Sequence, residues 1–142
     1  MPRRKHPRKI VAPPGFKGYR PYGIAFEPEE DVELLYEEYE AIKLSDYDLM
    51  PHHEACVLMG ISRPTFARIY ESARRKIARA MAEVLPIRCV YGNVYFEGKW
   101  FVCGRCDSLF TLPGKEFERK CPVCGNGEVG VLENGPEKEN AG

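Results

Sequence analysis

The sequence predicts a mainly α N-terminal domain of three helices, followed by a small β domain built around four cysteines. Three observations lead to this fold class. Apolar residues between positions 32 and 84 recur at the spacing of helices. Gly60 and Ser62 stand between two of these stretches, where a tight turn is expected. Two Cys-x-x-Cys pairs follow, at residues 103–106 and 121–124, with aromatic residues around them.

The composition is that of a folded protein. The 142 residues are 44% hydrophobic and 11% aromatic, which supports a packed core and leaves room for one domain or two small ones. No apolar run approaches the ~20 residues needed to cross a bilayer. The basic N-terminus is not followed by the apolar segment of a secretory signal. We therefore expect a cytoplasmic protein without membrane contact.

Charge is segregated along the chain, although the formal net charge is zero. Residues 1–26 contain seven Lys or Arg and no acid, residues 27–50 contain ten acids and one lysine, and residues 51–90 are again basic. Such segregation favours a basic surface that faces a partner. A single charged run is more often just a solvated face, and this alternative stays open here.

Residues 1–26 predict a basic, extended arm rich in proline and glycine. Five prolines exclude a helix, because proline lacks the N–H group and restricts φ. Short basic arms of this kind enter a minor groove or follow phosphates. The same composition suits ribosomal RNA or a solubilising tail. The candidate contact residues are Arg3, Arg4, Lys5, Arg8 and Lys9.

Residues 27–86 predict the three helices. The first is expected to begin at Pro28, among acids that favour a helix N-terminus, and to continue to about Leu44. Its apolar stripe would be Val32, Leu35, Tyr36, Tyr39 and Ile42, and its solvated face Glu33, Glu37, Glu38 and Glu40. The second helix is expected over residues 51–59.

The third helix is expected from Ser62 to about Val84, where Pro86 ends it. Its core stripe would be Phe66, Ile69, Tyr70, Ala73, Ile77, Ala80, Met81 and Val84.

Helices two and three match a helix-turn-helix motif. Cys56 is small where two backbones approach, Gly60 accepts the positive φ of the turn, and Ser62 caps the second helix. That helix would enter the major groove of double-stranded DNA, with Arg63 and Arg68 nearest the base edges. A plain three-helix domain with a solvated basic face is the alternative. The expected DNA-binding residues are Ser62, Arg63, Pro64, Thr65, Ala67, Arg68, Ser72, Arg75 and Arg79.

Residues 87–133 predict short strands or a hairpin, then a zinc ribbon. Positions 87–102 are rich in β-branched and aromatic residues, with turn signals at Gly92-Asn93 and Gly98-Lys99. Two Cys-x-x-Cys pairs can hold one tetrahedral Zn²⁺ whose closed shell makes it structural, and Gly104 and Gly125 would let the chain curl around it. Iron is the second candidate for the metal, because four thiolates accept either ion, and disulfides fit a cytoplasmic protein less well. Residues 134–142 are expected to be a disordered tail. The ligands would be Cys103, Cys106, Cys121 and Cys124.

Two resemblances extend this interpretation. Residues from about Asp31 to Met81 resemble the C-terminal promoter-reading domain of bacterial sigma factors, which carries a similar E-A-x-x-x-G-[IV]-S-R-x-T run before a long helix. Residues 3 to about 95 resemble a small prokaryotic family of uncharacterised, predicted DNA-binding proteins, with a departure at residues 50–53. The matching segments are the Pro-Arg-Arg start, Tyr19-Arg-Pro-Tyr-Gly23, Glu38-Tyr-Glu-Ala-Ile-Lys-Leu44, Gly60-Ile-Ser-Arg-Pro-Thr-Phe66, Glu71-Ser-Ala-Arg-Arg-Lys76 and Gly92-Asn93.

Together these patterns predict a sequence-specific DNA-binding protein that regulates transcription, with a ribbon for docking or for pairing in a homodimer. No glycine-rich phosphate loop and no nucleophile with an evident base is present, so we expect no enzyme. The alternative is an adaptor on the ribosome or RNA polymerase that binds RNA or protein through the arm and the ribbon. A redox or iron protein is a third class.

Overall fold

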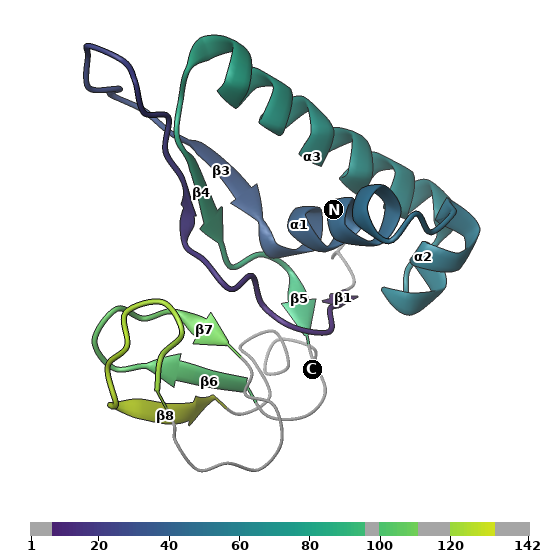
Figure 1. The fold of residues 1–142 in the computed structure, drawn as a ribbon. Coiled ribbons are helices and arrows are strands. Elements are labelled where there is room, and N and C mark those ends of the chain that lie inside the picture. Colours follow the sequence, from purple (N-terminus) through teal and green to yellow (C-terminus); the bar gives the residue numbers. More distant parts are fainter. Residues whose placement is uncertain (1–6, 96–99, 111–119, 133–142) are drawn as a thin grey trace, which may run out of the picture.

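The computed structural model describes residues 7–95, 100–110 and 120–132 (Figure 1). Within these ranges the helices are α1 (Tyr36–Ile42), a short π-helical segment η1 (Lys43–Tyr47), α2 (His52–Leu58) and α3 (Arg63–Glu83). Small sheets accompany them, so the fold is mixed α/β and the expectation of a mainly α domain is wrong. No helix in the described ranges is both long and apolar enough to cross a bilayer.

The strands form three small sheets. The first pairs β1 and β5 in parallel, and the second has the order β2-β4-β3, with β4 antiparallel to β2 and parallel to β3. The third is antiparallel, with the order β7-β6-β8. The bounds are β1 Arg8–Lys9, β2 Gly18–Tyr19, β3 Val32–Leu35, β4 Ile87–Val90, β5 Val94–Tyr95, β6 Trp100–Cys103, β7 Leu109–Phe110 and β8 Val129–Leu132.

The first helix begins later than expected. Val32 and Leu34 are buried while Glu33 is exposed, which is the two-residue alternation of a strand rather than the spacing of a helix. This strand, β3, pairs along its length with β4. α1 therefore begins at Tyr36, and the Glu38 carboxylate accepts a hydrogen bond from the Leu35 N–H at 2.9 Å, as a helix-capping acid does.

The expected solvated face of α1 is in fact its buried face. Glu37, Glu38 and Glu40 are 5%, 4% and 2% exposed. Buried carboxylates need hydrogen-bond donors, and these come from distant segments. Glu38 accepts from Ser72 and Lys76 on α3, and Glu40 lies 3.4 Å from the backbone N–H of Val11. The acids thus connect α1 to its neighbours.

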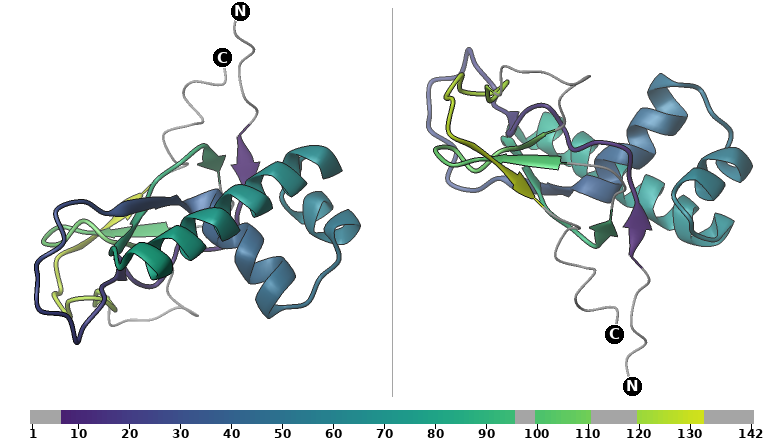
Figure 2. Two further views of the ribbon diagram at one scale, coloured as in Figure 1. Left: turned by 90° about the horizontal axis from the view of Figure 1, so that it is seen from above. Right: turned by 90° about the horizontal axis from the view of Figure 1, so that it is seen from below.

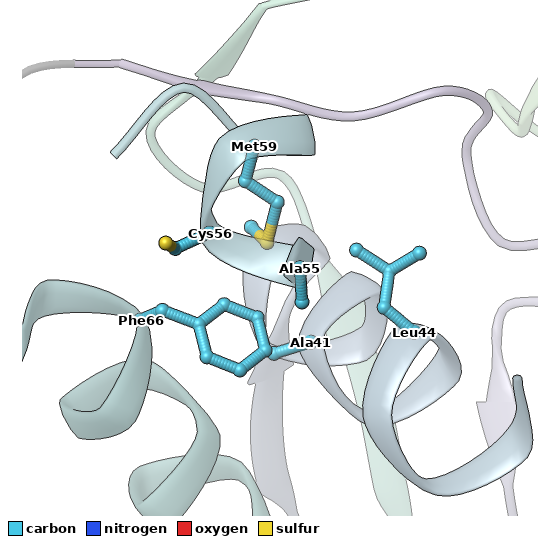
Figure 3. Packing of buried hydrophobic residues seen from close by; sticks show 6 residues of the cluster. All are labelled: Ala41, Leu44, Ala55, Cys56, Met59 and Phe66. Carbon is cyan, nitrogen blue, oxygen red and sulfur yellow. The ribbon is translucent and has the colours of Figure 1, made fainter. Parts of the chain in front are cut away.

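The second and third helices form as predicted. α2 and α3 are separated by residues 59–62, and Gly60 has φ +67°. Their shared core contains Ala55, Cys56, Met59 and Phe66, packed against Ala41 and Leu44 of the preceding elements (Figure 3). One member of the expected α3 stripe lies elsewhere, since Met81 is 76% exposed.

The N-terminal segment is part of the fold from residue 8 onward. β1 pairs with β5, and β2 pairs with β4. The first two strands of the chain therefore have partners that begin at residue 87 or later. The expected short strands after residue 87 are present, although β4 and β5 pair with distant strands and not with each other. Gly18 is needed at this pairing, because a Cβ there would lie 2.0 Å from the Ile87 carbonyl oxygen.

A small apolar core joins the helical part to the cysteine-bearing sheet. Ile10, Val94 and Trp100 are almost fully buried together, with Tyr36 and Leu109 packed against them. Figures 1 and 2 show α3 on one side of the β3–β4 pair and the β6–β7–β8 sheet on the other. The segment 96–99, with the predicted turn at Gly98-Lys99, and the tail 134–142 lie outside the described residues.

Candidate nucleic-acid interface and metal centre

The start of α3 is well defined by its own side chains. Ser62 has the extended backbone of an N-cap, and its Oγ accepts a hydrogen bond from the Thr65 N–H at 3.2 Å. Pro64 stands in the first turn, where its missing N–H costs nothing. α3 then runs for 21 residues, a length of about 31 Å.

The first turns of α3 carry exposed basic and small residues. Arg63, Pro64 and Arg68 are exposed, whereas Thr65 and Ala67 are half-buried. Arg68 donates from Nη2 to the Thr65 hydroxyl at 3.2 Å. Among the described residues, no carboxylate lies within ion-pair distance of Arg63 or Arg68. Their charges are therefore not neutralised within the described part of the chain.

Farther along α3 the cations and Ser72 have acidic partners. Glu38 accepts from Ser72 Oγ at 2.7 Å and from Lys76 Nζ at 2.8 Å, so the two residues are turned toward α1. Arg75 lies 3.0 Å from Glu71. Arg79 lies 3.1 Å from Glu83 and 3.3 Å from Glu30. The basic face is thus weaker at its C-terminal half than the sequence indicates.

The basic arm is divided by the structure. The Lys9 N–H donates to the Met59 carbonyl at 2.9 Å, which places β1 directly beside the turn between α2 and α3. Arg8 is only 8% exposed, so its side chain belongs to the interior more than to a free arm. Arg3, Arg4 and Lys5 lie outside the described residues.

Four cysteine sulfurs lie together at one end of the β6–β7–β8 sheet. The Sγ atoms of Cys103, Cys106, Cys121 and Cys124 are all within 4.8 Å of one another. Cys103 and Cys124 are 3.6 Å apart, and Cys106 and Cys121 are 3.7 Å apart. A tetrahedral ion with metal–sulfur distances of about 2.3 Å would place its sulfurs about 3.8 Å apart. The arrangement fits a metal ion, and the distances are far too long for disulfides.

Two equivalent loops present these sulfurs. In the first, the N–H groups of Arg105 and Cys106 point at Cys103 Sγ, at 3.3 and 3.4 Å. In the second, Val123 and Cys124 do the same for Cys121, at 3.3 and 3.5 Å. These donors stabilise thiolates, which are the form that binds metal.

Each loop closes through a residue with positive φ. Asp107 has φ +62° and Gly125 has φ +79°, and their N–H groups donate to the carbonyls of Cys103 and Cys121. Gly125 thus acts as expected, but the residue that curls the first loop is Asp107. Gly104 serves another purpose, because a Cβ there would lie 3.2 Å from the Glu128 carbonyl oxygen.

Ser108 is a site residue that the sequence analysis missed. Its hydroxyl lies 3.2 Å from Cys106 Sγ. This hydrogen bond is the main cause that lowers the pKa of the Cys106 thiol to about 6. Its carbonyl also accepts from the Cys103 N–H, as the Asn126 carbonyl accepts from Cys121. A signal was available, since Ser108 and Asn126 each stand five residues after the first cysteine of a pair.

The fold and the site define a mixed α/β protein with three helices and a four-cysteine cluster. Residues 1–96 match the family described as "Protein of unknown function DUF134". The chain therefore belongs to this family. No solved structure matches it.

Relatives named "UPF0251 protein" cover most of the chain. The protein of Chloroherpeton thalassium is 36% identical over 91% of this chain and 85% of its own. The protein of Methanothermobacter thermautotrophicus is 37% identical over 93% of this chain and 68% of its own. The protein of Pelotomaculum thermopropionicum is 40% identical over 87% of this chain and 93% of its own. A match over 93% of the chain must include residues 103–124, so the cysteine-bearing part belongs to the similarity as well.

Proposed function

We propose that this protein binds specific sequences of double-stranded DNA and regulates transcription, with no catalytic step. The observation that carries the proposal is the pair Arg63 and Arg68. Both are exposed on the first turns of a capped helix, and neither has an acidic partner among the described residues. An arginine in the major groove can donate two hydrogen bonds to guanine, which distinguishes it from the other bases.

The geometry of α2 and α3 supports this assignment. A short helix, a glycine turn with positive φ and a capped second helix are the elements of a helix-turn-helix motif. In this arrangement Ser72 and Lys76 hold α3 on α1, while Arg75 and Arg79 approach phosphates. Lys9, which lies beside the turn, would contact the phosphate backbone of the DNA.

We propose Zn²⁺ as the metal of the four-cysteine site. Four thiolates with tetrahedral spacing suit zinc or iron, and a complete protein shell leaves no position for a substrate. The ion would be structural, and the β6–β7–β8 sheet would form a zinc-ribbon module for docking or for a homodimer.

The test is a change of base preference. DNA ligands selected from a random duplex library should yield a consensus, and Arg68→Ala should relax one position by about 1–3 kcal/mol of discrimination. Arg74→Ala is the matched control, because Arg74 lies on the same helix but is 3.6 Å from Asp46 and over the Tyr70 ring. Equal affinity and equal preference in wild type and Arg68→Ala would refute this docking.

The same selection distinguishes the adaptor alternative. A protein of the ribosome or of RNA polymerase would give no duplex consensus and would co-sediment with that particle from native extracts. Binding by the arm alone would also give no consensus, because contacts to phosphates do not distinguish one sequence from another. The affinity would then fall with rising salt by the same factor for all duplexes.

A further inference from the structure

A cleft of about 390 Å³ lies between the helical part of the molecule and the four-cysteine unit. It is lined on one side by residues of the N-terminal segment, α1 and β4, and on the other by the loop that follows Cys106. Pockets of this size between two structural units are common ligand sites. The lining includes Phe16, Lys17, Tyr36, Cys89 and Tyr91.

The apolar lining of the cleft is aromatic. Tyr36 and Tyr91 lie with ring centroids 5.4 Å apart, and Phe16 completes this part of the lining. Flat rings of this kind favour a planar apolar group, through stacking and edge contacts. A purely aliphatic ligand would use these rings less well.

The polar lining is rich in hydrogen-bond donors. Lys17 donates one hydrogen bond to the Cys106 carbonyl, and an ammonium group has two more to offer. Tyr36 and Cys89 also line the cleft, and among the described residues neither the Tyr36 hydroxyl nor the Cys89 thiol has a hydrogen-bond partner. Burial raises the pKa of Tyr36 to about 12 and that of Cys89 to about 11, so both keep their protons at neutral pH.

The other charged side chains of the cleft are already engaged or exposed. Arg88 is held by Asp31 at 3.1 Å and by Glu33, which leaves Lys17 as the cation with donors to spare. Asp107 also lines the cleft but is exposed at its edge. A ligand with one anionic group beside Lys17 and acceptors near the neutral donors would satisfy this lining.

We propose that the cleft binds a small aromatic anion, a planar ring that carries one carboxylate or phosphate group. The ligand would contact both the helical part and the cysteine loop, because the lining comes from both. This site is separate from α3, and the proposal does not depend on DNA binding.

The experiment uses the full chain with its metal as purified and follows backbone amide signals by NMR. Adenosine 5′-monophosphate and 4-hydroxybenzoate represent the two sources of such an anion, a nucleotide and an aromatic acid. At least one should give saturable shifts at residues 16–17, 89–91 and 107–109. Adenosine lacks the anion and inorganic phosphate lacks the ring, so each should bind about tenfold more weakly or not at all.

Variants place the ligand in the cleft. Lys17→Gln should weaken binding about tenfold, and Tyr36→Phe, which keeps the ring, should weaken it several-fold. Lys43→Gln is the control, because Lys43 pairs with Asp48 away from the cleft. The proposal is overturned if neither ring anion saturates, if phosphate alone binds as well, or if the shifts lie on α3.

Discussion

Glu38 of α1 accepts a hydrogen bond from Lys76 of α3 at 2.8 Å, with the carboxylate only 4% exposed. The same carboxylate accepts from Ser72 on α3 and from the Leu35 N–H ahead of α1. One acid therefore fixes the middle of the candidate recognition helix to the body of the protein. This contact has consequences for stability that differ from those of the exposed ion pairs.

Glu38→Ala should lower the free energy of unfolding by about 1–3 kcal/mol, because Lys76, Ser72 and the Leu35 N–H all lose their acceptor. Urea unfolding followed by circular dichroism measures the change. Glu71→Ala is the control, since its pair with Arg75 is exposed and should be worth less than about 1 kcal/mol. Equal effects of the two substitutions would mean that Glu38 is not a structural link.

Gly92→Ala should destabilise the fold by about 1–3 kcal/mol, since a Cβ there would lie 2.0 Å from the buried Glu37 Oε1. The Glu37 carboxylate also accepts from the Asn93 N–H at 3.2 Å, so it cannot move away without losing that bond. Gly127→Ala, which meets nothing within 4 Å, should change thermal stability little. A neutral Gly92→Ala would show that the Glu37 side chain shifts freely.

Metal removal should unfold the β6–β7–β8 sheet, because four thiolates held within 4.8 Å of one another repel each other when no cation lies between them. We expect one metal ion per chain by elemental analysis, and its loss in Cys106→Ser. Cys89→Ser should keep the metal, since Cys89 is not part of the cluster. Visible absorption in the purified protein would identify iron in place of zinc.

Glu40 should make stability depend on pH. Burial is the main cause that raises the pKa of this carboxyl above its ordinary 4.5. The folded state therefore holds the proton more tightly, and this stabilising contribution is present below pH 4.5 and lost as pH rises through the folded-state pKa. Glu40→Gln, which keeps an acceptor for the Val11 N–H, should flatten the unfolding free energy across that window. An unchanged pH profile in urea unfolding would assign the dependence to other groups.

Local signals made α2, α3 and the cysteine loops predictable. Ser62 caps its helix through an atom three residues away, Gly60 supplies its own positive φ, and each Cys-x-x-Cys loop closes within six residues. Such interactions join residues that are close in the sequence. These elements and the four clustered cysteines are therefore predictable without any long-range information.

The strand β3 and the buried acids could not be predicted in the same way. Val32 becomes a strand residue because it pairs with Ile87, which lies far along the chain. Glu38 is buried because Ser72 and Lys76 supply its donors. In a single sequence, the alternating acids of residues 27–40 resemble a solvated helix face, and only tertiary pairing separates the two cases.

The pairing of β1, β2 and β3 with strands that begin at residue 87 also bears on how the chain is made. These three strands leave the ribosome first, yet their partners β4 and β5 span Ile87–Val90 and Val94–Tyr95. During synthesis, α1, α2 and α3 can form before β4 and β5 are available to either sheet. The N-terminal strands must wait in an unpaired state, so the sheets close late and around a helical unit that already exists.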